Sequence, residues 1–215
     1  MYRIRLLTLF GLLLVAAPAA AQSPAIGFKL GATFSNLEVG DDDGDETSSL
    51  TAFGGGGFIR FGLAGLGLQV DLLALTKGSH VESATEGESD LKLDYVEVPV
   101  QLVFGLGSGR FAPYLMVGPS FAFEIGCEVS AEDGDTEFEA DCDDGDIFER
   151  NKFDIGATGA LGLMIPAGPG SVLIEGRYTH GFTNIFDNEA QQGDNEVHNR
   201  SWGVFGGYSI PIGSR

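Results

Sequence analysis

Two acidic stretches of this chain carry side chains that could bind a hard metal ion. The first offers Asp41, Asp43 and Asp45, and the second offers Asp141, Asp143 and Asp146. Carboxylate oxygens are the ligands that Ca²⁺ prefers. Neither stretch has the EF-hand spacing, which needs glycine at the sixth position and glutamate at the twelfth. We therefore expect solvated loops whose charges repel one another, with loose bridging by divalent cations to anionic lipid headgroups as the alternative.

The histidines offer the other candidate chemistry. A base at His180, oriented by Asp154 or Asp187, and a nucleophile at Ser201 would be the parts of a hydrolase. A triad is defined by geometry in space, and the spacing of these residues does not indicate one. We expect ordinary residues near the ends of structural elements, and not an enzyme. The histidines concerned are His80, His180 and His198.

The chain has two cysteines, Cys127 and Cys142, which lie in one predicted polar loop. In an exported protein we expect them to form a disulfide, which would stabilise the fold by about 3 kcal/mol on the chain-entropy model. A metal site is the alternative, but a second ligand pair with zinc-type spacing is missing from the sequence. We predict no cofactor.

The first 21 residues have the pattern of a secretory signal peptide. Arg3 and Arg5 precede an apolar stretch at residues 6–17, and three alanines precede Gln22. The apolar stretch is too short to span a bilayer as a helix. We therefore expect residues 1–21 to be a signal peptide and residues 22–215 to form one domain.

The net charge of the chain is −19 at pH 7. Binding to phosphate backbones needs clustered Lys and Arg side chains. The sequence therefore argues against nucleic acid as a partner.

Apolar and polar residues alternate with a period of two over most of the chain, which predicts β-strands. The clearest pair lies at residues 91–126 and has a tight turn at 105–110. Strands of about ten residues with one wholly apolar face are typical of membrane-spanning barrels. The other predicted strands cover residues 25–36, 51–61, 66–77, 152–165, 171–179 and 199–212.

The connections between these eight strands are alternately long and short, and the first is long. The four long segments hold 25 of the 31 Asp and Glu residues. Bacterial outer-membrane barrels have short periplasmic turns and longer outer loops. The sequence therefore predicts an all-β, eight-stranded antiparallel up-and-down barrel in the outer membrane. A soluble barrel such as a lipocalin is not expected to concentrate its Asp and Glu residues at one rim.

Charged side chains of both signs fall on the face opposite the apolar one. They belong inside the barrel, because a lipid-facing Arg or Lys costs about 2–4 kcal/mol at mid-depth. An eight-stranded barrel is only wide enough for side chains to fill, so we expect a plugged, ion-paired lumen. The predicted lumen charges are Lys29, Arg60, Asp71, Glu97, Glu124, Asp154, Glu175 and Arg177.

Aromatic residues near the strand ends have the character of girdle anchors at the two membrane interfaces. We expect this role for Tyr95, Phe153, Tyr178, Phe182 and Trp202.

Four segments of the chain resemble the PorT-like outer-membrane β-barrel proteins, which are similar to other small eight-stranded surface barrels. The resemblance implies an outer-membrane barrel, with membrane lipid and the barrel-assembly machinery as partners. The family has no common catalytic residues to carry over. One departure is the absence of a terminal aromatic residue, since Tyr208 is the last aromatic. The four segments are IGFKLGATFSNL (26–37), DYVEVPVQLVF (94–104), PYLMVGPSFAF (113–123) and EGRYTHGFTNIFD (175–187).

Three functions fit this sequence. The first is a structural or surface-interaction barrel, whose loops contact ions, lipid headgroups or an extracellular partner. The second is a narrow transport channel or a component of a secretion apparatus. The third is a rim enzyme that acts on lipid or protein. Fold alone does not choose among them.

Overall fold

The computed structural model describes residues 24–39, 47–62, 65–83, 87–107, 109–133, 136–141, 151–183 and 197–213. Nine β-strands account for most of these residues. None of the described residues forms a helix with the length and apolarity that crossing a membrane requires. The strands are β1 Ala25–Val39, β2 Thr47–Phe61, β3 Leu66–Ser83, β4 Gly87–Gly105, β5 Ala112–Asp133, β6 Thr136–Asp141, β7 Phe153–Ala167, β8 Gly170–Gly181 and β9 Val197–Pro211.

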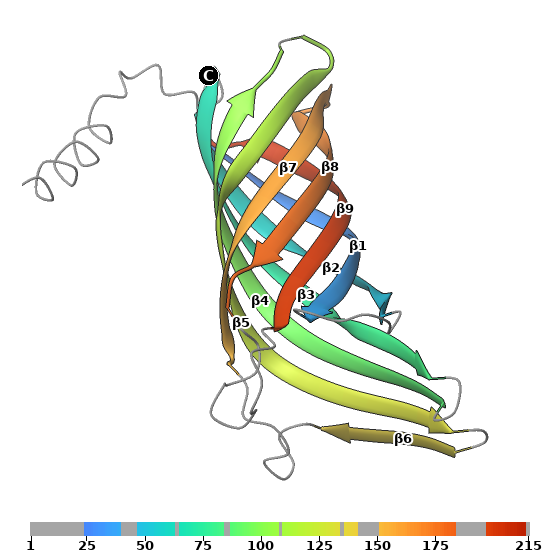
Figure 1. The fold of residues 1–215 in the computed structure, drawn as a ribbon. Coiled ribbons are helices and arrows are strands. Elements are labelled where there is room, and N and C mark those ends of the chain that lie inside the picture. The colour runs from blue at the N-terminus through green and yellow to red at the C-terminus, as the bar shows by residue number, and fades with distance from the viewer. Residues whose placement is uncertain are drawn as a thin grey trace, which may run out of the picture.

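Eight of the strands close into a barrel (Figure 1). The sheet order is β4-β3-β2-β1-β9-β8-β7-β5-β6, and an additional β4–β5 pairing closes it. The first and last strands pair from Ala25 opposite Pro211 to Val39 opposite Val197, and every pairing is antiparallel. The predicted all-β, eight-stranded antiparallel barrel is therefore confirmed.

Side chains alternate between the inside and the outside of this barrel, as the pleat of a strand requires. On β1, Lys29 is 1% exposed while its neighbours Phe28 and Leu30 are 55% and 64% exposed. The same pattern of buried polar and exposed apolar residues recurs along β7 and β8. The exposed apolar side chains form the outer face, which is the arrangement that a barrel in lipid needs.

The predicted long loops are partly strand, which corrects the sequence-based boundaries. Where a loop was predicted at residues 78–90, β3 continues to Ser83 and β4 begins at Gly87. The two strands remain paired from Gly78 opposite Lys92 to Ser83 opposite Gly87. The sequence did not predict this hairpin, because its residues are mostly polar and lack the alternation that indicates a strand. Outside a membrane, backbone pairing can continue without an apolar face.

The loop predicted at residues 127–151 also contains strand. β5 continues to Asp133 and pairs there with β6, from Glu128 opposite Asp141 to Asp133 opposite Thr136. β6 is a ninth strand that the sequence did not predict, and it lies beyond the closed barrel. In Figure 1 the β3–β4 hairpin and the β5–β6 hairpin project together past the other strands.

The opposite end of the barrel has the short turns. β7 and β8 are separated by two residues, and Gly168 in this turn has a φ of 60°. The turn between β2 and β3 uses Gly62 and Gly65 at φ values of 73° and 104°. Glycine suits these positions, because a side chain is strained at positive φ. Residues 1–21 lie outside the described residues, so the signal peptide stays a prediction.

Candidate functional site: the charged barrel interior

Two carboxylates at the centre of the barrel are held between two cations. Lys29 Nζ lies 3.1 Å from Asp71 Oδ2 and 3.0 Å from Glu175 Oε2. Arg177 Nη2 lies 2.9 Å from Glu175 Oε1 and also pairs with Asp71 Oδ2. All four side chains are at most 3% exposed. These ion pairs join β1, β3 and β8, which come from distant parts of the sequence.

Amide and guanidinium groups extend this central layer to β2 and β4. Arg60 Nε donates to Gln69 Oε1 at 2.6 Å, and Gln69 Nε2 donates to Asp71 Oδ1 at 2.6 Å. Arg177 Nη2 also donates to Gln101 Oε1 at 3.3 Å. Charge-assisted hydrogen bonds of this kind are stronger than neutral ones. Three cations and two carboxylates therefore share one buried network across the lumen.

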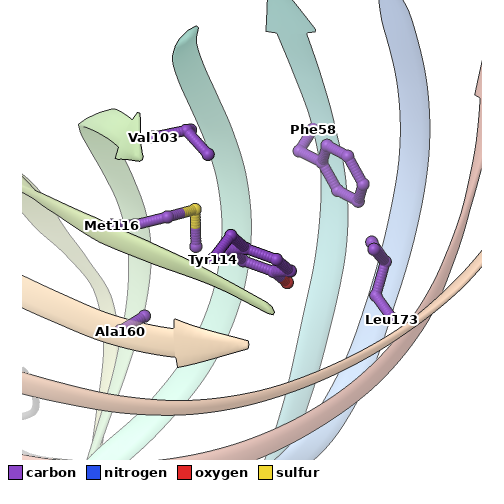
Figure 2. Packing of buried hydrophobic residues seen from close by; sticks show 6 residues of the cluster. All are labelled: Phe58, Val103, Tyr114, Met116, Ala160 and Leu173. Atoms are coloured by element: carbon purple, nitrogen blue, oxygen red, sulfur yellow. The ribbon is translucent and has the colours of Figure 1, made fainter. Parts of the chain in front are cut away.

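An apolar layer packs against the central network inside the barrel. It is the cluster of Phe58, Val103, Tyr114, Met116, Ala160 and Leu173, each 6% exposed or less. Figure 2 shows these side chains gathered on the inner side of the strands around the barrel. The two layers are connected, because the Tyr114 hydroxyl donates to Glu175 Oε2 at 3.3 Å and the Arg60 guanidinium lies 4.8 Å from the Tyr114 ring centroid.

A second polar layer lies on the loop side of the network. Lys77 Nζ is 2.6 Å from Glu97 Oε2, and both side chains are at most 3% exposed. Lys77 also lies 5.2 Å from the ring centroid of Tyr95. A small apolar cluster of Leu73, Leu75 and Phe205 is buried in the same interior.

The structure places all eight of the predicted lumen charges inside the barrel, each at most 9% exposed. Five of them meet in the central network: Lys29, Arg60, Asp71, Glu175 and Arg177. Glu97 pairs with Lys77, whereas Glu124 and Asp154 are buried on β5 and β7. The sequence analysis missed Lys77, although its odd-numbered position on β3 matches that of Asp71 and indicates the same inward face.

One aromatic residue was assigned wrongly. Tyr95 was expected at the membrane interface but is 1% exposed and lies inside the barrel. It shares the inward face of β4 with Glu97, so the period of the strand, and not aromatic character, decides its place. Phe153, Phe182 and Trp202 are 39%, 58% and 64% exposed on the outer face.

The hydrolase arrangement that was considered for the rim is not formed. Asp154 and Ser201 are buried on the inner face, at 5% and 9% exposure. His180 belongs to the outer face, where it lines a groove with Arg200 and packs 5.2 Å from the Phe182 ring. A base on one side of the barrel wall cannot activate a nucleophile on the other. Asp187 lies outside the described residues.

The predicted calcium and disulfide sites fall mostly outside the described part of the chain. Asp41, Asp43, Asp45, Asp143 and Asp146 lie outside it, while Asp141 ends β6. Within the described ranges, no group of three or more potential ligands is close enough to hold a metal ion. Cys127 is buried on β5. Cys142 is not among the described residues, so the disulfide stays a prediction.

Removal of the Tyr114 hydroxyl tests the link between the apolar layer and the network. We expect Tyr114→Phe to lower the free energy of unfolding by about 1 kcal/mol, because a buried carboxylate loses one donor while its ion pairs remain. Urea unfolding of the folded barrel in detergent measures the change. Tyr178→Phe, on the outer face, is the matched control and should change the midpoint less. Equal shifts in the two variants would contradict a role for this hydrogen bond.

A family model for the outer membrane protein beta-barrel domain matches residues 20–187, which is most of the chain. The chain belongs to this family. It is an integral outer-membrane β-barrel protein of the bacterial cell envelope, and its closed sheet and apolar outer face suit a lipid environment. No curated protein matches the sequence.

Two solved structures of outer-membrane barrels are similar in fold to this chain. The crystal structure of Neisserial surface protein A superimposes with a TM-score of 0.51 at 12% identity, over 90% of this chain and 99% of that one. The outer membrane protein OprG from Pseudomonas aeruginosa gives a TM-score of 0.54 at 14% identity, over 89% and 98%. At these identities the likeness concerns the fold alone.

Proposed function

We propose that this outer-membrane barrel is a closed, non-catalytic surface protein, whose projecting hairpins and acidic loops contact ions, lipid headgroups or an extracellular partner. The observation that carries the proposal is that side chains fill the interior of the barrel. Hydrogen-bonded charges and an apolar cluster pack against each other in the lumen, and their largest side chains are almost fully buried. An interior filled in this way stabilises the barrel and has no room for a pore. The function is therefore expected at the surface of the projecting hairpins and loops.

The projecting hairpins supply the contact surface. β3, β4, β5 and β6 continue past the barrel as one paired sheet, in which Lys92 pairs with Glu128 at 3.1 Å. The segments that belong to these hairpins are rich in Asp and Glu. Charge complementarity favours a cationic partner or divalent cations at this surface, and it disfavours nucleic acid. The calcium candidates of the two acidic stretches belong to this part of the proposal.

Two finer assignments belong to the proposal as well. The four segments that resemble the PorT-like proteins support membership of that group within the family. The alanines before Gln22 support cleavage of residues 1–21 by a signal peptidase. Insertion would then use the barrel-assembly machinery. Non-enzymatic function is supported by the separation of His180 from Ser201 by the barrel wall.

Conductance in planar lipid bilayers tests the closed lumen. We expect the refolded protein to give no steady single-channel current, because ions would have to displace buried ion pairs. The variant Phe58→Ala/Tyr114→Ala, which thins the apolar layer, should conduct more often than the wild type. A band that shifts on boiling shows for each sample that the barrel is folded. A steady current from the wild type would overturn the proposal in favour of the transport channel.

A further inference from the structure

The outer wall of the barrel has a groove that the function proposed above does not use. It spans β5, β7, β8 and β9 and has a volume of about 440 Å³. The side chains that line it and carry the argument below are Val117, Ala157, Gly159, Tyr178, His180 and Arg200.

The groove exists because the outward positions of β7 are small. Ala157 and Gly159 face outward there, on either side of the buried Thr158. A Cβ added to Gly159 would meet nothing nearer than the Met116 carbonyl oxygen at 3.9 Å. Val117 on β5 and Tyr178 on β8 are the outward neighbours of Gly159 and form the sides. The result is an apolar trough, on the face of the barrel that contacts lipid chains.

One end of this trough is basic. His180 and Arg200 are opposite each other in the β8–β9 register, near the loop ends of both strands. The next outward pair toward the short turns is Tyr178 and Trp202, whose ring centroids are 4.5 Å apart. Tyr and Trp side chains mark the membrane interface in barrels of this kind. Arg200 therefore lies at the level of lipid headgroups.

A guanidinium at this position is unusual for the chain, which has only 12 Lys and Arg residues against 31 Asp and Glu residues. Arginine pairs with phosphate oxygens in a bidentate geometry, and basic pockets at the membrane surface bind lipid headgroups. An acyl chain fits an apolar trough that opens to the bilayer. The charge and the shape are thus complementary to two parts of one molecule.

We propose that this groove binds one anionic lipid of the outer leaflet, which carries both a phosphate group and acyl chains. Its phosphate lies at Arg200 and His180, and an acyl chain lies along Ala157 and Gly159. The site is on the outside of the barrel wall, so it does not depend on whether the lumen conducts or on what the loops bind. The small residues Ala157 and Gly159 leave part of the β7 backbone exposed, and a bound lipid would cover it.

Trp202 allows a direct test, because it is the single tryptophan of the chain and contacts a wall of the groove. The protein is reconstituted in phosphatidylcholine bilayers with a small fraction of lipid that carries brominated acyl chains, which quench tryptophan fluorescence. We expect brominated phosphatidic acid to quench Trp202 as if enriched roughly tenfold over brominated phosphatidylcholine, which is the scale of a charge-assisted contact.

Variants separate the two parts of the site, each with a matched control. Arg200→Gln removes the charge and Gly159→Leu fills the trough, and either should bring the enrichment close to one. Arg110→Gln removes an exposed charge at a short turn, and Gly206→Leu adds a leucine on the outer face where a Cβ meets nothing within 4 Å. Both controls should keep the enrichment. Equal quenching by the two lipids, or equal loss in test and control variants, would show that the groove has no such site.

Discussion

Replacement of Arg177 by leucine is expected to lower the free energy of unfolding of the barrel by about 3–5 kcal/mol. Arg177 contacts both carboxylates of the central network, Asp71 and Glu175, as well as Gln101. Without it, two buried carboxylates share the one ammonium group of Lys29, and removal of water makes their mutual repulsion strong. Urea unfolding in detergent, followed by the fluorescence of Trp202, measures the loss.

A second substitution separates the charge effect from lost packing. In Asp71→Asn/Arg177→Leu one of the two uncompensated carboxylates is neutral, so we expect part of the lost stability to return. Arg110→Leu makes the same change at an exposed turn residue, and its effect should be below about 0.5 kcal/mol. Additive effects of the Asp71 and Arg177 substitutions would argue against a coupled network.

The substitution Gly56→Ala is expected to lower the stability by about 3 kcal/mol or more, through overpacking. A Cβ at Gly56 would collide with the Leu72 carbonyl oxygen and would lie 3.0 Å from Leu73 Cα. These are backbone atoms of the paired strand β3, where Gly56 is opposite Leu73. They cannot rotate away as a side chain can, so the β2–β3 seam would have to shift. The yield of heat-modifiable protein and its urea midpoint report the effect.

The neighbouring glycine provides the control. Gly57 faces outward, and a Cβ there would lie 3.6 Å from the Gly27 carbonyl oxygen, which is an ordinary contact. We expect Gly57→Ala to change the free energy of unfolding by less than about 0.5 kcal/mol. The two variants differ by one position along the same strand. Equal destabilisation would mean that loss of glycine as such, and not the close approach of β3, is responsible.

The sequence determined which face of each strand is inside. A period of two assigns every side chain to one of two faces once a few of them are known, and lipid on one side makes the assignment strict. The predicted inward positions, such as Lys29, Asp71 and Glu175, are therefore buried in the structure. The eight segments with a period of two likewise indicated the number of strands in the barrel, and the alternation of long and short connections indicated their antiparallel order.

The partners of each inward residue were decided only by the tertiary structure. Lys29 meets Glu175 across 146 positions of sequence, because β1 and β8 are on either side of β9 and the register of each pairing sets the height of every side chain. The alternation with a period of two gives the face of each side chain but not the register between neighbouring strands. The sequence therefore could not predict that Arg177 contacts Asp71 while Glu97 contacts Lys77.

The hairpins above the membrane and the groove on the wall were also decided in three dimensions. Outside the bilayer both faces of a strand contact water, so the sequences of β6 and of the extensions of β3, β4 and β5 need no alternation of apolar and polar residues. These segments were therefore not predicted as strands. The groove needs Val117, Gly159, Tyr178 and Arg200, which come from four strands, to lie together on one outer surface. Local pattern determines the direction of a side chain, whereas closure of the barrel determines its neighbours.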